Sequence, residues 1–340
     1  MTNQQRFATG VALGAGAMLA AYRLARSRHA ISFDGRVVVI TGGSRGLGLV
    51  MARLFAAEGA KVAVLARDVN ELERARQDLE PRGGEVVTIR CDIRRRADVR
   101  AAIDQVMDRW HAVDVLVNNA GVIQVGPFDH MDHDDFENAM ATHFWGPLHL
   151  MLEVVPIMQH RTFGRIVNIA SIGGKIAVPH LTPYSASKFA LVGLSDGARA
   201  ELERYGIRVT TVAPGLMRTG SPRNATFKGR HESEYAWFKI SSSIPGVTIS
   251  AERAARKILE AARHGDPELT ITPQAKAAAA VNVVLPGLVA RAMMLVDRLL
   301  PGPSGAGGDR VQRGRESESR WAPRIVTALT DKAAVANNEL

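Results

Sequence analysis

The sequence predicts an α/β protein built on one parallel sheet with helices on both faces. Short runs rich in Val and Ile recur through residues 31–273, and longer segments with helical periodicity separate them. The short runs are apolar almost throughout, which is typical of strands that are buried on both faces. A length of 340 residues and a hydrophobic content of 46% are sufficient for a sizeable core.

Seven runs are expected to form the strands of this sheet. They are RVVVIT (36–41), KVAVLA (61–66), EVVTIR (85–90), VDVLVN (113–118), GRIVNIAS (164–171), IRVTTVAP (207–214) and LTIT (269–272). Segments such as VNELERARQDL and ADVRAAIDQVMDRW supply the helices between them. Because crossovers between parallel strands are right-handed, the series predicts a single doubly wound domain of the Rossmann type.

Composition divides the chain into four parts. We expect a basic, apolar N-terminal segment at 1–30, the α/β domain at 31–273, an apolar extension at 274–300 and a disordered tail at 301–340. The tail begins PGPSGAGGDRVQRGRESESR, and such a mixture of Gly, Ser and charge is typical of disorder.

Composition also excludes several classes of protein. The single cysteine, Cys91, rules out an internal disulfide framework and suits a reducing compartment, so we expect a cytoplasmic protein. No Cys/His cluster has metal-ligand spacing, and we expect no metal. The net charge of +9 is not gathered on one element with interleaved aromatics, and nucleic acid is therefore not an expected partner.

The first expected strand leads directly into the glycine-rich turn TGGSRGLG (41–48). Glycine permits a tight turn there and lets the backbone approach a pyrophosphate, while the amides that open the following helix face the anion. A glycine-rich turn alone is weak evidence, but its place after the first strand predicts nucleotide binding. The loop residues that we assign to this site are Thr41, Gly42, Ser44, Arg45, Gly46, Leu47 and Gly48.

The end of the second strand bears on the choice of cofactor. A dinucleotide fold that prefers NAD usually carries an acid there, whereas this chain reads VLARD, with Ala66 and Arg67 at that place. Arg45 and Arg67 would suit the 2′-phosphate of NADP. The neighbouring Asp68 leaves NAD open, and the two arginines are alternatively solvated surface charges.

Six motifs follow one another in register along residues 33–265. They are TGGSRGLG, the Asp92 of CDI, NNAG (118–121), GRIVNIAS ending in Ser171, YSASK (184–188) and PGLMRT (214–219). With these motifs in these strand and helix positions, the chain resembles the short-chain dehydrogenase/reductase family. The resemblance implies an oxidoreductase that transfers a hydride between nicotinamide and a carbonyl or secondary alcohol, and the two arginines favour NADP as its cofactor.

The chemistry can also be argued from the residues of the expected reaction centre. Tyr184 and Lys188 stand at i and i+4 and share one face of a helix. A lysine ammonium favours the phenolate, so it should lower the pKa of the tyrosine from its usual value of about 10. Ser171, at a strand end, can hold a carbonyl oxygen. The resemblance implies the same roles, with Lys188 also bonding the nicotinamide ribose. Otherwise the three are a strand-end cap, a half-buried aromatic and a solvated lysine.

The resemblance also implies further contacts with the cofactor. Asn119, Ala120 and Gly121 would line its adenosine side, and Asp92 with the backbone of Ile93 would meet the adenine. Pro214, Gly215 and Thr219 would meet its nicotinamide end. One position departs from the family pattern, because THFWG places His143 where an asparagine is usual. That histidine either takes part in the site, for example as a proton relay, or is a packed polar residue.

The two ends of the chain suggest a membrane surface. Residues 7–22 are apolar, but as a helix they would span roughly 24 Å of the about 30 Å of hydrocarbon. Four arginines (6, 23, 26 and 28) flank this segment, and residues 1–30 contain no acidic residue. The segment is expected to be a short anchor, a surface-lying helix or a leader packed on the fold. We expect attraction to an anionic membrane.

The apolar segment 277–300 contains Pro286 and two arginines, Arg291 and Arg298, on one face. It is expected to form an amphipathic hairpin in an interface, or else a pair of helices that covers the substrate pocket or a partner subunit. Substrate specificity should lie in residues 221–248, where Tyr235, Trp237 and Phe238 indicate an apolar wall for a steroid, lipid or aromatic substrate.

We expect a homodimer or homotetramer. The alternative function is an NADP-binding sensor or scaffold without turnover.

Overall fold

The computed structural model of the chain describes residues 21, 26–305, 307–318 and 324–339. The apolar segment 7–22 lies outside the described residues apart from Ala21. Of the four arginines that were expected to be unopposed, Arg26 is instead paired with Asp266, with Nε and Oδ1 2.8 Å apart. This correction could not be made from the sequence, because the partner lies 240 residues away.

Seven parallel strands form the central sheet in the order β11-β7-β6-β4-β1-β2-β3. The strands are β1 (Val37–Thr41), β2 (Lys61–Ala66), β3 (Val86–Arg90), β4 (Val115–Asn118), β6 (Gly164–Ile169), β7 (Ile207–Pro214) and β11 (Glu268–Ile271). The chain builds outward from β1 in one direction, then crosses to β4 and builds outward in the other. The predicted doubly wound sheet is thereby confirmed, with each predicted run containing most or all of one strand.

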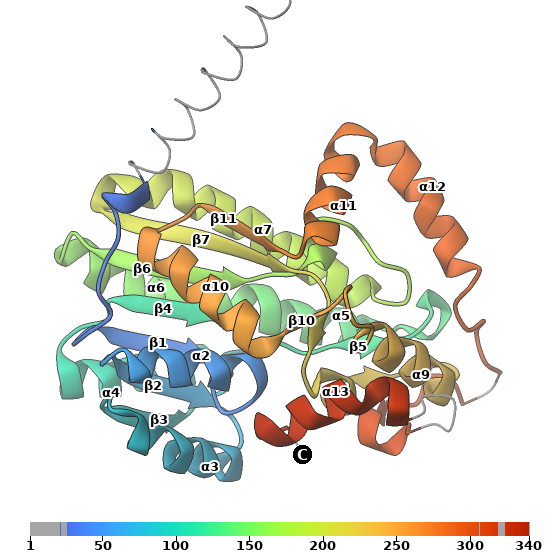
Figure 1. Cartoon of the computed structure of the whole chain (residues 1–340), viewed down its shortest axis with the longest axis horizontal. Coiled ribbons are helices and arrows are strands. Elements are labelled where there is room, and N and C mark those ends of the chain that lie inside the picture. Colours follow the sequence, from blue (N-terminus) through green and yellow to red (C-terminus); the bar gives the residue numbers. More distant parts are fainter. Residues whose placement is uncertain (1–20, 22–25, 306, 319–323, 340) are drawn as a thin grey trace, which may run out of the picture.

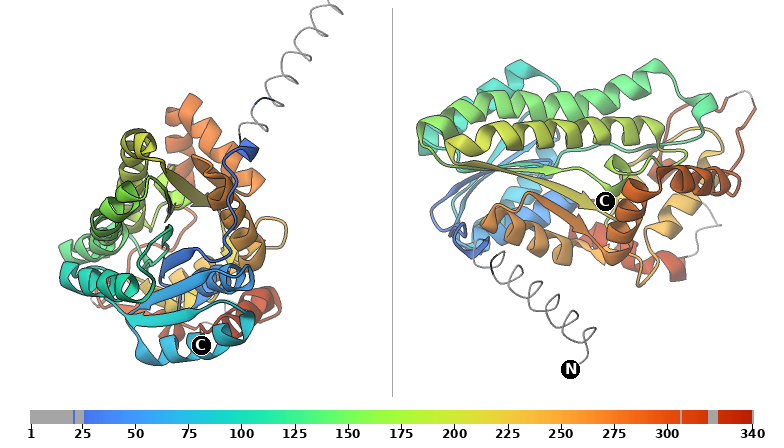
Figure 2. Two further views of the ribbon diagram at one scale, coloured as in Figure 1. Left: turned by 90° about the vertical axis from the view of Figure 1, so that its left-hand side faces the viewer. Right: turned by 90° about the horizontal axis from the view of Figure 1, so that it is seen from above.

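Helices cover both faces of this sheet (Figure 1, Figure 2). One face carries α2 (Gly46–Ala57), α3 (Val69–Leu79) and α10 (Ala251–His264), and the other carries α4 (Arg96–Trp110), α6 (Gly146–His160) and α7 (Thr182–Leu202). The spacing of buried residues explains how each helix lies. In α10 they are Ala251, Ala254, Ala255, Ile258, Leu259, Ala261 and Ala262, which form an apolar stripe against the sheet.

The single cysteine lies in the core on the α4 and α6 side. Cys91 directly follows β3 and is only 1% exposed. Burial, together with the charges of Asp98 and Asp92, raises the pKa of its thiol to about 12. The thiol is therefore protonated and shielded in the folded protein.

Small elements close the region beyond the carboxyl ends of the strands. The strand pair β8 (Met217–Arg218) and β10 (Ile249–Ser250) lies beside β5 (Gln124–Val125), β9 (Thr226–Phe227) and β12 (Gln312–Arg313), which form a three-stranded sheet. The short helix α8 (Ser221–Asn224) and helix α9 (His231–Ser241) complete the segment that was expected to set specificity.

The apolar extension forms two helices, α11 (Pro273–Val284) and α12 (Pro286–Asp297), with a break at Leu285. Figure 1 shows them projecting from the body of the molecule as an elbow. Their exposed large apolar residues include Val281, Val283, Val284, Leu285, Leu288, Met294, Leu295 and Val296, followed by Leu299. Within the described residues, no helix is both long and apolar enough to cross a membrane.

The expectation of a disordered tail is corrected for much of residues 301–340. The segment contributes β12 and a helix, α13 (Arg324–Ala336), that packs on α9. Lys239 Nζ lies 2.9 Å from Asp331 Oδ1, and the buried hydroxyls of Ser243 and Thr330 are 2.6 Å apart. These partners come from a distant part of the sequence, so the local composition does not reveal them.

Candidate active site

The structure brings Ser171, Tyr184 and Lys188 together at the carboxyl end of β6. Ser171 follows this strand, while Tyr184 and Lys188 lie one turn apart on α7. The Nζ atom of Lys188 is 5.7 Å from the centre of the Tyr184 ring, and the Tyr184 side chain is hydrogen-bonded to Ser171. The Ser171 Oγ also accepts a hydrogen bond of 3.0 Å from the Gly173 amide.

Burial dominates the electrostatics of this group. It raises the pKa of the Tyr184 phenol, although the hydrogen bond to Ser171 acts in the opposite direction. Burial also lowers the pKa of Lys188 to about 7, and its Nζ donates to the Ile169 carbonyl at 2.8 Å. The expected lowering of the tyrosine pKa by lysine is therefore not the dominant effect in this state. The phenol retains its proton at neutral pH and can act as a donor.

His143 lies behind Tyr184, in a π-helical turn (Ala141–Trp145) that leads into α6. Its Nε2 accepts the Val122 amide proton at 3.1 Å, which leaves the imidazole proton on Nδ1, 2.8 Å from Ser187 Oγ. The Ser187 hydroxyl donates in turn to the backbone carbonyl of Tyr184 at 2.8 Å. Burial, and secondly the charge of Lys188, lower the pKa of His143 well below its usual range. The ring is neutral, and both its nitrogens are engaged.

Sequence reasoning missed Ser187, which joins His143 to the backbone of Tyr184. Its role depends on a contact between α7 and the π-helical turn, 44 residues apart. The rings of His143 and Tyr184 also meet edge to face, with their centres 5.4 Å apart. The histidine thus fixes the start of α7 through two kinds of contact.

The glycine-rich turn forms a cradle whose glycines have no room for side chains of their own. Gly42 and Gly46 have positive φ angles of 61° and 56°. A Cβ on Gly42 would lie 2.8 Å from the Ala120 Cα, and one on Gly48 would collide with the Gly42 carbonyl. The backbone can therefore approach a ligand closely, and the turn opens α2, so its geometry fits a pyrophosphate.

Asn119 and Thr41 hold this cradle in place. The Thr41 Oγ1 accepts from the amides of Asn119 and Ala120 at 3.0 and 3.1 Å, and Asn119 Nδ2 donates to the carbonyls of Thr41 and Gly42 at 3.1 Å. Asn118 instead ties β4 to β6, because its Nδ2 donates to Asn168 Oδ1 at 2.7 Å.

Charged groups around the turn are arranged in pairs. Arg45 Nη1 lies 3.1 Å from Glu71 Oε1, and the Ser44 hydroxyl donates to the same carboxylate at 2.9 Å. Asp68 is the N-cap of α3, and its carboxylate accepts from the amides of Asn70 and Glu71. Arg67 is exposed at the end of β2. Asp68, the acid that kept NAD as an alternative cofactor, is thus engaged in capping α3.

Two further groups lie at the expected adenine end. Asp92 forms a close pair with Arg94, whose Nη2 is 2.6 Å from Oδ2, and this pair lowers the pKa of Asp92. The sequence reasoning did not single out Arg94. The neighbouring Ile93 is buried, and its carbonyl lies 3.2 Å from His149 Nδ1.

The expected nicotinamide end is tightly packed. Pro214 ends β7, and a Cβ on Gly215 would lie 2.7 Å from the Thr272 Oγ1. Thr219 is buried, with its hydroxyl 2.7 Å from that of Ser221. Gly121, which was expected on the adenosine side, is close to His143, because a Cβ on it would lie 3.1 Å from the His143 Nε2.

An apolar cluster adjoins Tyr184. Its buried members are Val125, Leu181, Ala225, Phe227, Tyr235 and Phe238, and Tyr184 and Trp237 pack against them. Tyr235 is only 1% exposed, so it supports this wall from behind instead of lining it. Trp237 is held by a hydrogen bond of 2.6 Å from its Nε1 to Glu234 Oε2.

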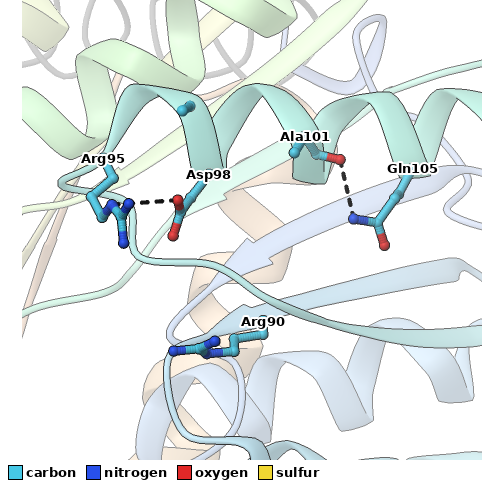
Figure 3. A pocket seen from close by; sticks show the side chains of 6 residues that line it. Arg90, Arg95, Asp98, Ala101 and Gln105 are labelled. Carbon is cyan, nitrogen blue, oxygen red and sulfur yellow. Dashed lines mark hydrogen bonds and ion pairs between the residues drawn. The ribbon is translucent and has the colours of Figure 1, made fainter.

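A separate depression lies between the end of β3 and α4, as Figure 3 shows. It is lined by Arg90, Arg95, Ala97, Asp98, Ala101 and Gln105. Arg95 pairs with Asp98 at 3.5 Å, and the Gln105 amide donates to the Ala101 carbonyl. None of Ser171, Tyr184 and Lys188 lines it, so it is distinct from the candidate active site.

The sheet, the glycine cradle after its first strand and the Ser/Tyr/Lys group at the carboxyl end of β6 together define a nucleotide-dependent dehydrogenase or reductase. The model of the short chain dehydrogenase family matches residues 36–228. The chain belongs to this family and is an oxidoreductase of that class.

Similar sequences and similar solved structures support this membership. A dehydrogenase/reductase SDR family protein 7-like protein of Anopheles gambiae is 34% identical over 257 residues, which are 74% of this chain and 80% of the relative. A short-chain dehydrogenase/reductase of Burkholderia phymatum, solved in complex with NAD, has a TM-score of 0.69 at 26% identity and covers 76% of this chain and 96% of its own.

A gluconate 5-dehydrogenase of Burkholderia cenocepacia was solved with NADP and tartrate. It has a TM-score of 0.63 at 28% identity, over 72% of this chain and 96% of its own. The structural neighbours thus include complexes with both nicotinamide dinucleotides, and this supports a nicotinamide cofactor without choosing between the two forms.

Proposed function

We propose that the protein is an NADP-dependent oxidoreductase that interconverts an apolar carbonyl compound and the corresponding secondary alcohol. The observation that carries this proposal is the convergence of Ser171, Tyr184 and Lys188 at the carboxyl end of β6, beside the glycine cradle. The cradle fits the pyrophosphate, and the bound cofactor would supply or accept the hydride.

In the reducing direction, the Ser171 hydroxyl holds the carbonyl oxygen of the substrate, while Tyr184 donates its phenolic proton to that oxygen. A C–H bond forms at the carbonyl carbon with the electron pair of the hydride that the cofactor would supply, and the π electrons move to oxygen. The O–H bond of Tyr184 breaks as that oxygen takes the proton, which leaves the alcohol and a phenolate. Because burial raises the pKa of Tyr184, the proton is in place at neutral pH. The Lys188 Nζ donates a hydrogen bond to the Ile169 carbonyl, and this bond fixes the lysine side chain beside the phenol.

NADP is favoured over NAD by the end of β2. Arg67 is exposed there and is free to approach a 2′-phosphate. The neighbouring Asp68 is already engaged as the N-cap of α3. An apolar substrate is favoured by the half-buried Trp237, which packs with Tyr184 against a buried apolar cluster.

The function is tested by mixing the full chain with NADPH or NADH and a panel of ketones and aldehydes that ranges from small polar to steroid-sized apolar compounds. We expect oxidation of NADPH with the larger apolar members. Nucleotide binding without turnover across the panel would instead support the alternative, a nucleotide-binding sensor or scaffold.

We also propose contact with an anionic membrane through α11 and α12, where exposed residues such as Leu295 and Leu299 lie near Arg291 and Arg298. The full chain should float with anionic vesicles and less with neutral ones, and Leu295→Asp should reduce this flotation. If self-association in solution covers the same helices, the variant will change the oligomeric state and leave flotation unaltered.

A further inference from the structure

The C-terminal segment, residues 324–339, lies against the cofactor side of the α/β domain. In Figure 1, the red helix α13 runs below α9, and its C-terminal end is directed toward α2 and α3. It packs on α9 through the Lys239–Asp331 pair, and Thr330 contacts the buried Ser243 just beyond the end of α9. The helix is thus fixed to the domain, and the residues after it reach the glycine cradle.

Residues 337–339 make direct contacts with the cradle. The Gly46 amide donates to the Asn337 carbonyl at 2.8 Å, and Asn338 Nδ2 donates to the Ser44 carbonyl at 2.8 Å. A Cβ on Gly46 would lie 3.0 Å from Glu339 Oε1. Asn337 and Glu339 are both buried, with Glu339 only 5% exposed.

Glu339 also extends across to the expected nicotinamide side. Its Oε2 accepts a hydrogen bond of 2.6 Å from the Gly220 amide, and its backbone carbonyl accepts from Asn224 Nδ2 at 3.4 Å. The Glu339 carboxyl group thus lies beside Gly46 at the start of α2 and accepts one backbone amide, so it occupies space that an anionic ligand at this turn would use.

Two arginines on the helices beside the cradle hold this segment. Arg53 on α2 donates to the Ala336 carbonyl at 2.9 Å and to Asn337 Oδ1 at 2.8 Å. Arg74 on α3 donates to Asn338 Oδ1 at 2.6 Å. The contacts come from side chains of two separate elements in addition to the loop backbone, so the segment occupies a defined site.

A pyrophosphate at this turn would need the Gly46 amide and the side-chain-free space beside it, and the segment fills both. We propose that residues 324–339 and the pyrophosphate of the cofactor compete for the glycine cradle, so that displacement of the segment controls cofactor binding. The inference rests on the proposed function, in which this cradle binds a nicotinamide dinucleotide.

Hydrogen exchange on the full chain tests this competition without any substitution. Saturating NADPH should slow amide exchange in the cradle and speed it in residues 324–339, although ligands ordinarily slow exchange. Exchange in residues 324–339 that is unchanged or slower with NADPH would overturn the proposal.

A matched pair of variants gives a second readout, the dissociation constant for NADPH. Arg74→Ala removes the contact with Asn338, and Arg76→Ala removes an equal charge from the same helix, where its partners are Glu73 and Glu80. Loss of a cation should weaken binding of an anion, yet competition predicts that Arg74→Ala binds NADPH about fivefold more tightly than Arg76→Ala.

The two failures have different signatures. Equal or weaker binding by Arg74→Ala, relative to Arg76→Ala, overturns the competition and leaves the proposed function standing. Absence of binding of NADPH and NADH to the wild type and to both variants overturns the proposed function, and the competition with it.

Discussion

The Nδ1 atom of His143 lies 2.8 Å from the Oγ of Ser187, and that hydroxyl donates to the backbone carbonyl of Tyr184. The imidazole therefore holds the first turn of α7, which carries the phenol, and it does so as a neutral ring whose Nε2 accepts from Val122. Its contacts are those of a positioning residue.

This relationship predicts different outcomes for two substitutions of His143. His143→Ala leaves the partly buried Val122 amide without its partner and should lower kcat about 10-fold to 100-fold with little change in KM. His143→Asn offers an acceptor and a donor and should restore most of kcat. His160→Ala, an exposed change on α6, is the control. A kinetic pKa between pH 5 and 8 that disappears in His143→Asn would contradict the neutral positioning role.

Tyr184→Phe tests the proton donor itself. The substitution removes the phenolic proton and keeps the ring in the apolar cluster, so turnover should fall roughly 10²-fold to 10⁴-fold while binding of NADPH remains. Steady-state rates and NADPH titrations check the two parts. Tyr205→Phe, near the end of α7 and away from this cluster, should behave like the wild type. Wild-type turnover in Tyr184→Phe would remove the phenol from the mechanism.

Arg67→Asp should change the cofactor preference. Replacing the cation with a carboxylate converts attraction to the 2′-phosphate into repulsion, so the variant should lose affinity for NADPH and favour NADH relative to the wild type. The ratio of the two dissociation constants measures this, with the exposed Arg256→Asp on α10 as the control. If the ratio is the same in both variants, Arg67 is a surface charge and the preference resides elsewhere.

Lys188→Met should stabilise the protein in the absence of cofactor while abolishing turnover. Burial lowers the pKa of this lysine from 10.5 to about 7 in the folded chain, so burying its charge costs stability below pH 7. As pH rises from about 7 to 10.5, the unfolded chain binds the additional proton, and the cost fades. The gain in Tm should therefore be larger at pH 6 than at pH 9. A gain independent of pH, or one equalled by the exposed Lys257→Met, would refute the electrostatic cause.

Docking of the C-terminal segment should weaken as pH rises. Burial, and secondarily the charge of Glu71, raise the pKa of Glu339 from 4.5 to about 7, against the opposing effects of the Gly220 amide and Arg45. The docked carboxyl thus holds a proton that the released one gives up, so docking is strongest below pH 4.5 and loses strength until about pH 7. Hydrogen exchange of residues 324–339, corrected for intrinsic rates, should follow this course. The same slope in Glu339→Gln would assign it to another group.

The fold could be predicted from the sequence because its signals are local. Each run of apolar, β-branched residues became a strand of the parallel sheet, and the glycine turn stands at the start of α2, where its spacing placed it. The close approach of Ser171, Tyr184 and Lys188 follows from the same topology, since carboxyl ends of parallel strands share one edge of the sheet.

The remainder depends on contacts between distant residues. The helix α13 owes its place to partners such as Arg53 and Lys239, which a composition rich in Gly, Ser and charge does not indicate. Tyr235 looked like part of the pocket wall but lies in the core, because neighbouring Phe227 and Phe238 surround it. The raised pKa of Tyr184 likewise results from burial, which the spacing of a tyrosine and a lysine does not reveal.

Cys91 is a natural probe of local opening in this protein. It is the chain's single cysteine, it immediately precedes Asp92 at the expected adenine end, and its protonated thiol is inaccessible while the end of β3 is closed. Alkylation of Cys91 can then occur only in molecules in which the end of β3 has opened. The rate of modification therefore measures how often this edge of the sheet unfolds locally. The folded state therefore carries its own site-specific reporter of local opening, and no engineered label is needed to observe it.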